Sequence, residues 1–184
     1  WICVDQEGGR VARLKAPVLT LPAMRQVGDL NDPAFTRRIA RALGAQLLAL
    51  GFNCDFAPVL DVDTNPKNPV IGDRSFSRDP KVVAVHGAAF AAGLADAGII
   101  ACGKHFPGHG DTDVDSHLAL PTLRHSRDRL SRVEMVPFRE TREMMPSIMT
   151  AHVVFEALDP LVPATLSPKM IQGLLREEVG YPGV

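Results

Sequence analysis

Four short apolar runs recur along the chain at nearly even spacing. They occupy residues 2–4, 54–57, 99–102 and 147–150, and the starts of successive runs differ by 52, 45 and 48 residues. A polar or glycine-rich segment follows each run directly, which is typical of a buried strand that ends at the edge of a sheet. The pattern therefore predicts four strands.

The segments between these runs carry signals for the start and the end of helices. Three dipeptides place a capping side chain directly before a proline at the first helical position, namely Asp32-Pro33, Asp79-Pro80 and Ser167-Pro168. From each proline, apolar residues recur at helical spacing up to a glycine that can end the helix. A further helical stretch is predicted over residues 126–144, broken near Pro137.

Alternation of strand and helix predicts successive βα units and a parallel sheet. Polar residues follow all four strands, which favours the catalytic rim of a (β/α)₈ TIM barrel over a doubly wound sheet with its site at one switch point. Four units cannot close eight strands, so the expected fold is α/β, a TIM barrel of which the chain covers about four central βα units. No linker interrupts the sequence, and residues 1–184 are expected to be the central part of one domain without an internal boundary.

Composition narrows the class of partner. Of the 184 residues, 46% are hydrophobic and 22% are charged, as in ordinary globular proteins, and no apolar run reaches the length of a membrane span. Lys and Arg total 20 against 21 for Asp and Glu, so a net charge of -1 disfavours nucleic acid and anionic membranes as partners. Three widely spaced cysteines in apolar stretches predict buried free thiols.

The densest group of reactive side chains lies in residues 104–117, with the sequence KHFPGHGDTDVDSH. Metal binding is one interpretation, but His105 and His109 lie four apart without a helix to align them, and the alternating Asp residues lack the Gly and Glu of a calcium loop. We therefore expect no metal and no cofactor, with a metal-dependent hydrolase left as an alternative. The preceding GIIACGK matches a phosphate loop in spacing only, because its middle is the predicted strand.

Acid–base chemistry is a further interpretation of the same segment. Residues two apart in an extended chain point to the same side, so Asp115 could orient the His117 imidazole and stabilise its protonated form. An isolated Asp-x-His pair is weak evidence by itself, because surface Asp and His residues are common.

The other predicted strands are followed by groups suited to a polar ligand. Carboxylates and guanidinium groups bind hydroxyls, and together with a near-neutral chain they favour a small carbohydrate as substrate. Glu7, Arg10 and Asp61 are the candidates for structural ion pairs instead. The full set after the first, second and fourth strands is Asp5, Gln6, Glu7, Arg10, Arg13, Asp61, Asp63, Arg74 and His152.

Five segments together resemble the bacterial β-N-acetylglucosaminidases of glycoside hydrolase family 3. They are VDQEGGRVARL (4–14), FAPVLDVDTNP (56–66), IGDRSFSRDP (71–80), KHFPGHGDTDVDSH (104–117) and TAHVVF (150–155). The resemblance extends over essentially the whole chain. It implies a retaining exo-glycosidase that removes terminal β-linked N-acetylglucosamine, with fragments of peptidoglycan as the expected substrate. A cytoplasmic location is favoured, although the family also has exported and lipid-anchored members.

The resemblance also implies roles for individual residues. His117 would be the general acid/base with Asp115 as its partner, and the sugar would be bound by Asp5, Arg13, Arg74, Lys104 and His105. The family's nucleophile is an Asp that follows the strand after the GYPGV-type turn, here residues 180–184, so none is assigned and the 184 residues alone are expected to be inactive. A carbohydrate-binding relative without activity, a family 3 β-glucosidase and a family 3 phosphorylase are the alternatives.

Overall fold

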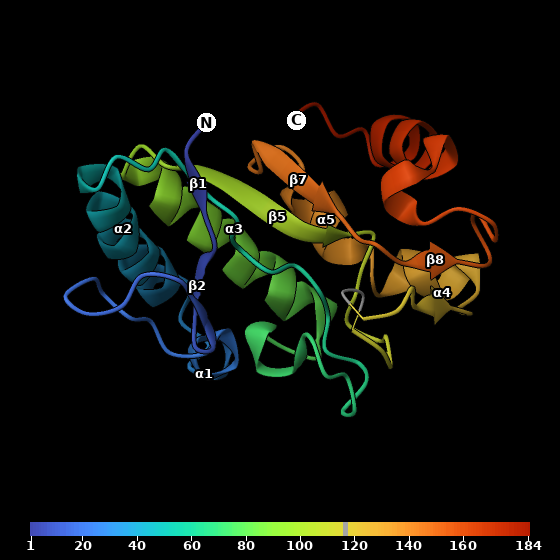
Figure 1. Ribbon diagram of the computed structural model, residues 1–184, viewed down its shortest axis with the longest axis horizontal. Helices are drawn as coiled ribbons and strands as arrows, with labels where there is room; N and C mark the ends of the chain where they lie inside the picture. The colour runs from blue at the N-terminus through green and yellow to red at the C-terminus, as the bar shows by residue number, and fades with distance from the viewer. Residues whose placement is uncertain (116–117) are drawn as a thin grey trace.

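Four parallel strands form the central sheet of the computed structural model, which describes residues 1–115 and 118–184 (Figure 1). They are β1 (Cys3–Val4), β4 (Cys54–Asp55), β5 (Ile100–Phe106) and β7 (Ser147–Thr150), and they lie side by side in chain order. All four predicted strands are confirmed. A strand order without reversal is that of a barrel wall, whereas a doubly wound sheet reverses its order at a switch point. The four strands do not close a barrel.

Two long helices begin at the predicted caps. The Asp32 carboxylate accepts a hydrogen bond from the Phe35 N–H at 2.9 Å, and α2 (Pro33–Ala49) follows. The Asp79 carboxylate accepts from the Lys81 N–H at 2.8 Å, and α3 (Pro80–Asp96) follows. Helix α3 packs between α2 and α5 (Val136–Thr141) and against β5. These helices therefore cover one face of the sheet.

The predicted 126–144 helix is two short helices. Helix α4 (Arg127–Arg132) ends before Pro137, which lies in the first turn of α5, where its missing N–H costs nothing. The predicted C-terminal helix is the π-helix η3 (Lys169–Glu178). Ser167 caps it, because its hydroxyl accepts from the Met170 N–H at 3.2 Å.

Several short elements were not predicted from the sequence. The strands β2 (Gln6–Gly8) and β3 (Val11–Ala12) form an antiparallel hairpin directly after β1. The strands β6 (Thr122–Leu123) and β8 (Val154–Phe155) pair in parallel outside the main sheet. The others are α1 (Met24–Asp29), η1 (Gly72–Arg74) and η2 (Ala164–Leu166).

The core lies between the sheet and α2, α3 and α5, and contains Phe76, Phe90, Phe106 and Phe138. All three cysteines are free thiols, as predicted; Cys54 and Cys102 are buried, whereas Cys3 is only half-buried. Burial raises the pKa of Cys54 to about 12.

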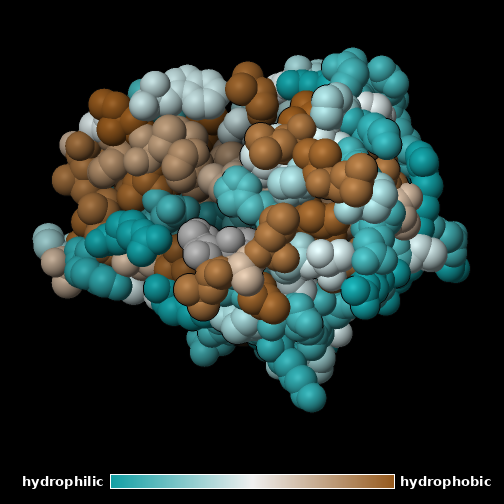
Figure 2. Space-filling model, turned by 45° about the vertical axis from the view of Figure 1, so that its right-hand side comes forward, coloured by the Kyte–Doolittle hydropathy of each residue, from teal (hydrophilic) through white to brown (hydrophobic). Residues whose placement is uncertain are grey.

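Apolar side chains are also exposed at the surface, and Figure 2 shows them mixed with polar residues over a wide area of one face. The most exposed large ones are Leu118, Leu161, Val184, Leu166 and Trp1. Among the described residues, no helix has the length and apolar character to cross a membrane.

Candidate functional site

A cleft of about 380 Å³ opens at the carboxyl ends of the parallel strands. Every strand of the sheet contributes to it, either by its last residues or by the segment that follows. This is the end of a parallel sheet at which α/β proteins bind their ligands. The lining residues are Asp5, Arg10, Val11, Arg13, Phe56, Pro69, Val70, Arg74, Lys104, His105, His109, Asp115, Met149, Thr150 and His152.

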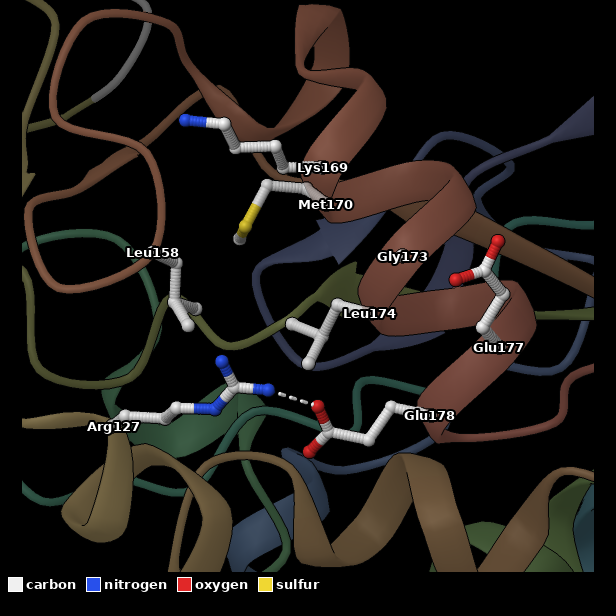
Figure 3. A pocket seen from close by; sticks show the side chains of 8 residues that line it. All are labelled: Arg127, Leu158, Lys169, Met170, Gly173, Leu174, Glu177 and Glu178. Atoms are coloured by element: carbon white, nitrogen blue, oxygen red, sulfur yellow. Dashed lines mark hydrogen bonds and ion pairs between the residues drawn. The ribbon is translucent and has the colours of Figure 1, made fainter.

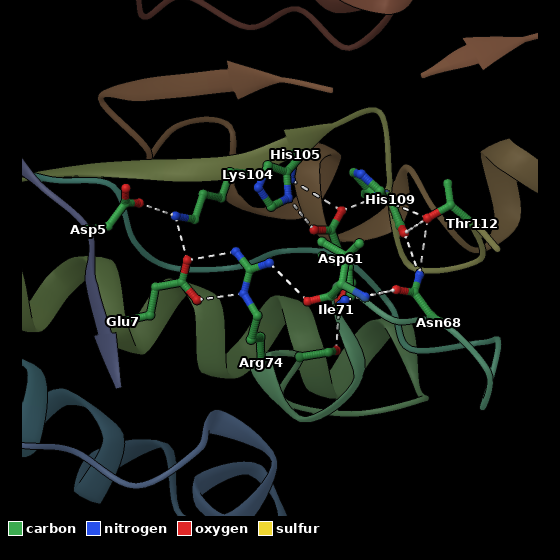
Figure 4. Close-up of polar contacts among 12 residues, drawn as sticks. Asp5, Glu7, Asp61, Asn68, Ile71, Arg74, Lys104, His105, His109 and Thr112 are labelled. Carbon is green, nitrogen blue, oxygen red and sulfur yellow. Dashed lines mark hydrogen bonds and ion pairs between the residues drawn. The ribbon is translucent and has the colours of Figure 1, made fainter. Parts of the chain in front are cut away.

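Lys104 is the centre of a buried ionic network at the floor of the cleft (Figure 4). Its side chain is only 2% exposed, and its Nζ lies 2.7 Å from the Asp5 carboxylate and 2.5 Å from the Glu7 carboxylate. Arg74 binds Glu7 from the other side through two hydrogen bonds of 2.8 and 2.9 Å. Burial would raise the pKa of Glu7, but Arg74 and Lys104 outweigh it and hold the pKa below its ordinary value. The network fixes Lys104 in one position.

A second carboxylate orients the histidines of the cleft. Asp61 is fully buried and accepts hydrogen bonds from the His105 Nδ1 at 2.6 Å and from the backbone N–H of His109 at 2.6 Å. Burial alone would raise the pKa of Asp61, but these interactions outweigh it and lower the pKa. The His105 Nδ1 bond turns the opposite edge of this ring, with Nε2, away from Asp61.

Asn68 connects the segment after β4 to the segment after β5. Its side-chain amide donates to the His109 carbonyl at 2.8 Å and to the Thr112 hydroxyl at 3.3 Å, while its oxygen accepts from the Ile71 N–H at 2.8 Å. The Thr112 hydroxyl lies 2.7 Å from the His109 Nδ1. These bonds hold the beginning of the 107–115 segment against the cleft wall.

The structure brings most of the predicted site residues to this cleft. Asp5, Arg74, Lys104, His105 and Asp115 all line it. The predicted catalytic residue His117 lies outside the described residues.

Arg13 also lines the cleft, but its side chain is 68% exposed and lies 4.0 Å from the Asp5 carboxylate. Glu7 and Arg10 form the predicted structural ion pairs, Arg10 with Asp73 at 3.3 Å. Arg10 also lines the cleft.

Sequence reasoning missed several residues that shape the site. Phe56, Val70, Met149 and Thr150 form the less polar part of the wall. Asp55 is fully buried and accepts a hydrogen bond from the Gln6 N–H, between the network residues Asp5 and Glu7. The sequence did contain a signal for Asp55, because a charged residue inside an apolar strand run is uncommon without a specific partner.

A larger cleft, about 530 Å³, lies between α4 and η3 (Figure 3). Its apolar wall is formed by Leu158, Met170 and Leu174, and an ion pair between Arg127 and Glu178 crosses one side. None of the described residues that line it comes from the four-stranded sheet. The convergent polar groups are in the smaller cleft, which is therefore the candidate site.

The sequence profile of the glycosyl hydrolase family 3 N-terminal domain matches residues 1–184. The β-hexosaminidase of Alkalilimnicola ehrlichii is 45% identical over 190 residues, which cover 99% of this chain and 54% of that protein. β-Hexosaminidase A of Pseudoalteromonas piscicida is 41% identical over 201 residues, covering 100% of this chain and 34% of that protein. The chain thus spans about a third to a half of the length of these relatives.

Solved structures give the same result. A family 3 β-N-acetylglucosaminidase from Paenibacillus sp. superimposes with a TM-score of 0.97 at 49% identity, covering 100% of this chain and 35% of that one. NagZ from Neisseria gonorrhoeae, in complex with N-trifluoroacetyl-D-glucosamine, superimposes with a TM-score of 0.94 at 41% identity, covering 100% of this chain and 56% of that one.

Proposed function

The chain belongs to the glycosyl hydrolase family 3 N-terminal domain, and from its cleft we propose that the protein is a retaining exo-β-N-acetylglucosaminidase. Its substrate would be a terminal β-linked N-acetylglucosamine, as in fragments of peptidoglycan. The observation that carries the proposal is the convergence of Asp5, Arg74, Lys104 and His105 on one cleft with Asp115 at its wall. The N-acyl glucosamine bound by the similar NagZ structure supports the substrate class.

The proposed sugar site combines a rigid cation with carboxylates that accept hydrogen bonds. Lys104 is held by Asp5 and Glu7 and donates to a sugar hydroxyl, while the partly exposed Asp5 carboxylate accepts from another. Arg13 and Arg74 add donors, and His105, turned by Asp61, presents its outer ring nitrogen. Because Lys104, Arg74 and His105 are held by other side chains, they lose little freedom when the sugar binds.

We assign the proton transfers to His117 with Asp115 as its partner. His117 protonates the leaving oxygen when the glycosyl–enzyme intermediate forms, and then takes a proton from the water that hydrolyses the intermediate. An adjacent carboxylate favours the protonated imidazole, which suits a proton donor near neutral pH. The proposal assigns the nucleophile to none of the 184 residues.

Residues 1–184 would form the central part of one (β/α)₈ barrel domain without an internal boundary. Two features of the structure support this. The sheet is open, and the free edge of β7 already pairs with Val184, whose carbonyl accepts from the Ile148 N–H at 2.8 Å and whose N–H donates to the Pro146 carbonyl at 3.1 Å. The exposed apolar side chains are also of the kind that further barrel units cover.

The test compares β-N-acetylglucosaminides with good and poor leaving groups in the full-length protein and in its His117→Ala variant. We expect turnover of the poor leaving group to fall about 10²–10⁴-fold and that of an acidic phenol to fall less, because a phenolate leaves without full protonation. The control is His125→Ala, which should affect both substrates alike. His125 follows His117 in the chain and binds Asp111. Unchanged turnover in His117→Ala would overturn the assigned role.

The same assay distinguishes the proposed hydrolase from a carbohydrate-binding protein and from a phosphorylase. Binding of N-acetylglucosamine without turnover by the wild-type protein would show a carbohydrate-binding protein instead of an enzyme. Formation of a sugar phosphate on addition of inorganic phosphate would show a phosphorylase.

A further inference from the structure

Asp55 is a buried carboxyl group that the proposed mechanism does not use. It lies on β4 in register with Val4 of β1 and Ala101 of β5, and it is fully buried. Its Oδ1 accepts a hydrogen bond from the Gln6 N–H at 3.0 Å. Its Oδ2 has no hydrogen-bond partner among the described residues. Such a group is costly to bury, so its presence in the centre of the sheet calls for a physical reason.

Through its hydrogen bond to Gln6, Asp55 is linked to the two neighbouring residues that bind Lys104. Gln6 lies between Asp5 and Glu7, whose carboxylates both bind the Lys104 Nζ, at 2.7 and 2.5 Å (Figure 4). The Gln6 side chain is tied to Leu14 by two hydrogen bonds of 2.9 and 3.0 Å. Asp55 thus fixes the backbone at the midpoint of the tripeptide that holds Lys104.

We infer that Asp55 is a positioning residue of the sugar site, which acts through the Gln6 amide on the two carboxylates that hold Lys104. The inference rests on the proposed function for its effect on the sugar, and on the geometry alone for its effect on Lys104. Asp55 would thus affect the affinity for the sugar without contacting the substrate.

The charges around Asp55 are balanced without a charge on Asp55 itself. Two cations, Lys104 from β5 and Arg74 from η1, already balance the two carboxylates of Asp5 and Glu7. Burial raises the pKa of Asp55 to about 8, opposed by the Gln6 amide and Lys104 and assisted by Glu7 and Asp5. On its own strand, its neighbour is the Cys54 thiol, whose pKa is also raised. The raised pKa therefore favours the protonated, uncharged form of Asp55 at neutral pH.

Ionisation of Asp55 would add a third anion beside Lys104. This anion would compete with Asp5, Glu7 and the sugar hydroxyls for the ammonium group. Above a pH of about 8, the affinity for the sugar should therefore fall, with the KM rising more than kcat changes.

The experiment uses three variants of the full-length protein. Asp55→Asn keeps an acceptor for the Gln6 N–H and is uncharged at every pH, whereas Asp55→Ala removes the acceptor. Asp159→Asn is the matched control, since Asp159 is a buried carboxylate bound to Ser167 at 2.6 Å, outside the cleft. The KM and kcat for an aryl β-N-acetylglucosaminide are measured from about pH 6 to pH 9.5, across the ionisation.

We expect Asp55→Ala to raise the KM about tenfold, the effect of losing one hydrogen bond in a charged network, with a smaller change in kcat. Asp55→Asn should match the wild type at neutral pH and lack its rise of KM at alkaline pH. An Asp55→Ala variant with an unchanged KM would overturn the inference. An alkaline rise in Asp55→Asn equal to that of the wild type would overturn the assignment of the proton.

A second readout does not depend on turnover. Lys104 is 2% exposed and should resist an amine-acylating reagent in the wild type, in Asp55→Asn and in Asp159→Asn, as measured by peptide mass spectrometry. In Asp55→Ala, labelling of Lys104 should increase severalfold. If Lys104 stays protected in Asp55→Ala while the protein remains folded, the positioning role is wrong. If instead the wild type does not hydrolyse the substrate, the proposed function fails and the labelling still decides the role of Asp55.

Discussion

Replacing Glu7 by Gln removes the anion that joins the buried Lys104 to the mostly buried Arg74. The Glu7 side chain is 2% exposed, and it holds Lys104 at 2.5 Å and Arg74 at 2.8 Å. At an effective dielectric constant of about 20, each unit-charge pair at roughly 3 Å interacts by about 5–6 kcal/mol, which the cost of burying the charges partly offsets. Breaking such a pair from one side typically destabilises a protein by about 3–5 kcal/mol, because a buried charge is left uncompensated.

The loss should be visible in the thermal unfolding of the Glu7→Gln variant. About 2–4 °C per kcal/mol for a protein of this size corresponds to a fall of about 10 °C in Tm. Glu156→Gln is the control, since Glu156 forms an exposed ion pair with Arg124 at 3.0 Å, a kind of pair that contributes about 0–1 kcal/mol. The double variant Glu7→Gln/Arg74→Gln, which leaves the charges balanced, should lose less than the sum of the two single variants.

The pH dependence of the stability provides a second test of the role of Glu7. Because the pKa of Glu7 is lower in the folded protein than its ordinary value, its contribution to stability is present above the ordinary pKa and is lost as the pH falls through the lowered one. Glu7→Gln should therefore flatten the acid side of the stability profile. A loss below about 1 kcal/mol, with an unchanged acid side, would refute the view that this network is a main support of the cleft floor.

Two further outcomes follow from buried positions away from the network. Burial lowers the pKa of His86, whose Nδ1 lies 2.8 Å from the Thr36 hydroxyl, so the stability it contributes is complete above its ordinary pKa and falls as the pH drops below it. The Tm of the wild type should therefore fall more between about pH 7 and pH 5 than that of His86→Gln, and equal slopes would contradict this. A β-carbon at Gly110 would lie 1.8 Å from the Val62 carbonyl oxygen, whereas one at Gly173 would meet nothing within 4 Å. Gly110→Ala should lower the Tm markedly and Gly173→Ala should raise stability by up to about 1 kcal/mol, as thermal unfolding of both will show.

The sequence pattern predicted the elements that hold the fold together. Hydrophobic periodicity and capping signals are local properties of the sequence. Asp32-Pro33 and Asp79-Pro80 therefore marked the starts of α2 and α3, and the apolar runs marked the strands. Most of the missed elements are two or three residues long and lie outside the four apolar runs, so the hydrophobic pattern carries too little signal for them; the six-residue helix α1 was missed as well. The β2–β3 hairpin contains buried Gln6 and Glu7, whose polarity hides a strand from any hydrophobic pattern.

The sequence by itself determined the α/β class, the parallel order of the units and the residue types that gather after the strands. Only the tertiary structure decided how these residues divide their work, because distances between chain segments far apart in sequence do not follow from local pattern. It placed Glu7 between Lys104 and Arg74, across separations of 97 and 67 residues. It also buried Asp55 against the Gln6 amide, and this burial, which does not follow from the adjacent residues in the sequence, raises the pKa of the carboxyl group.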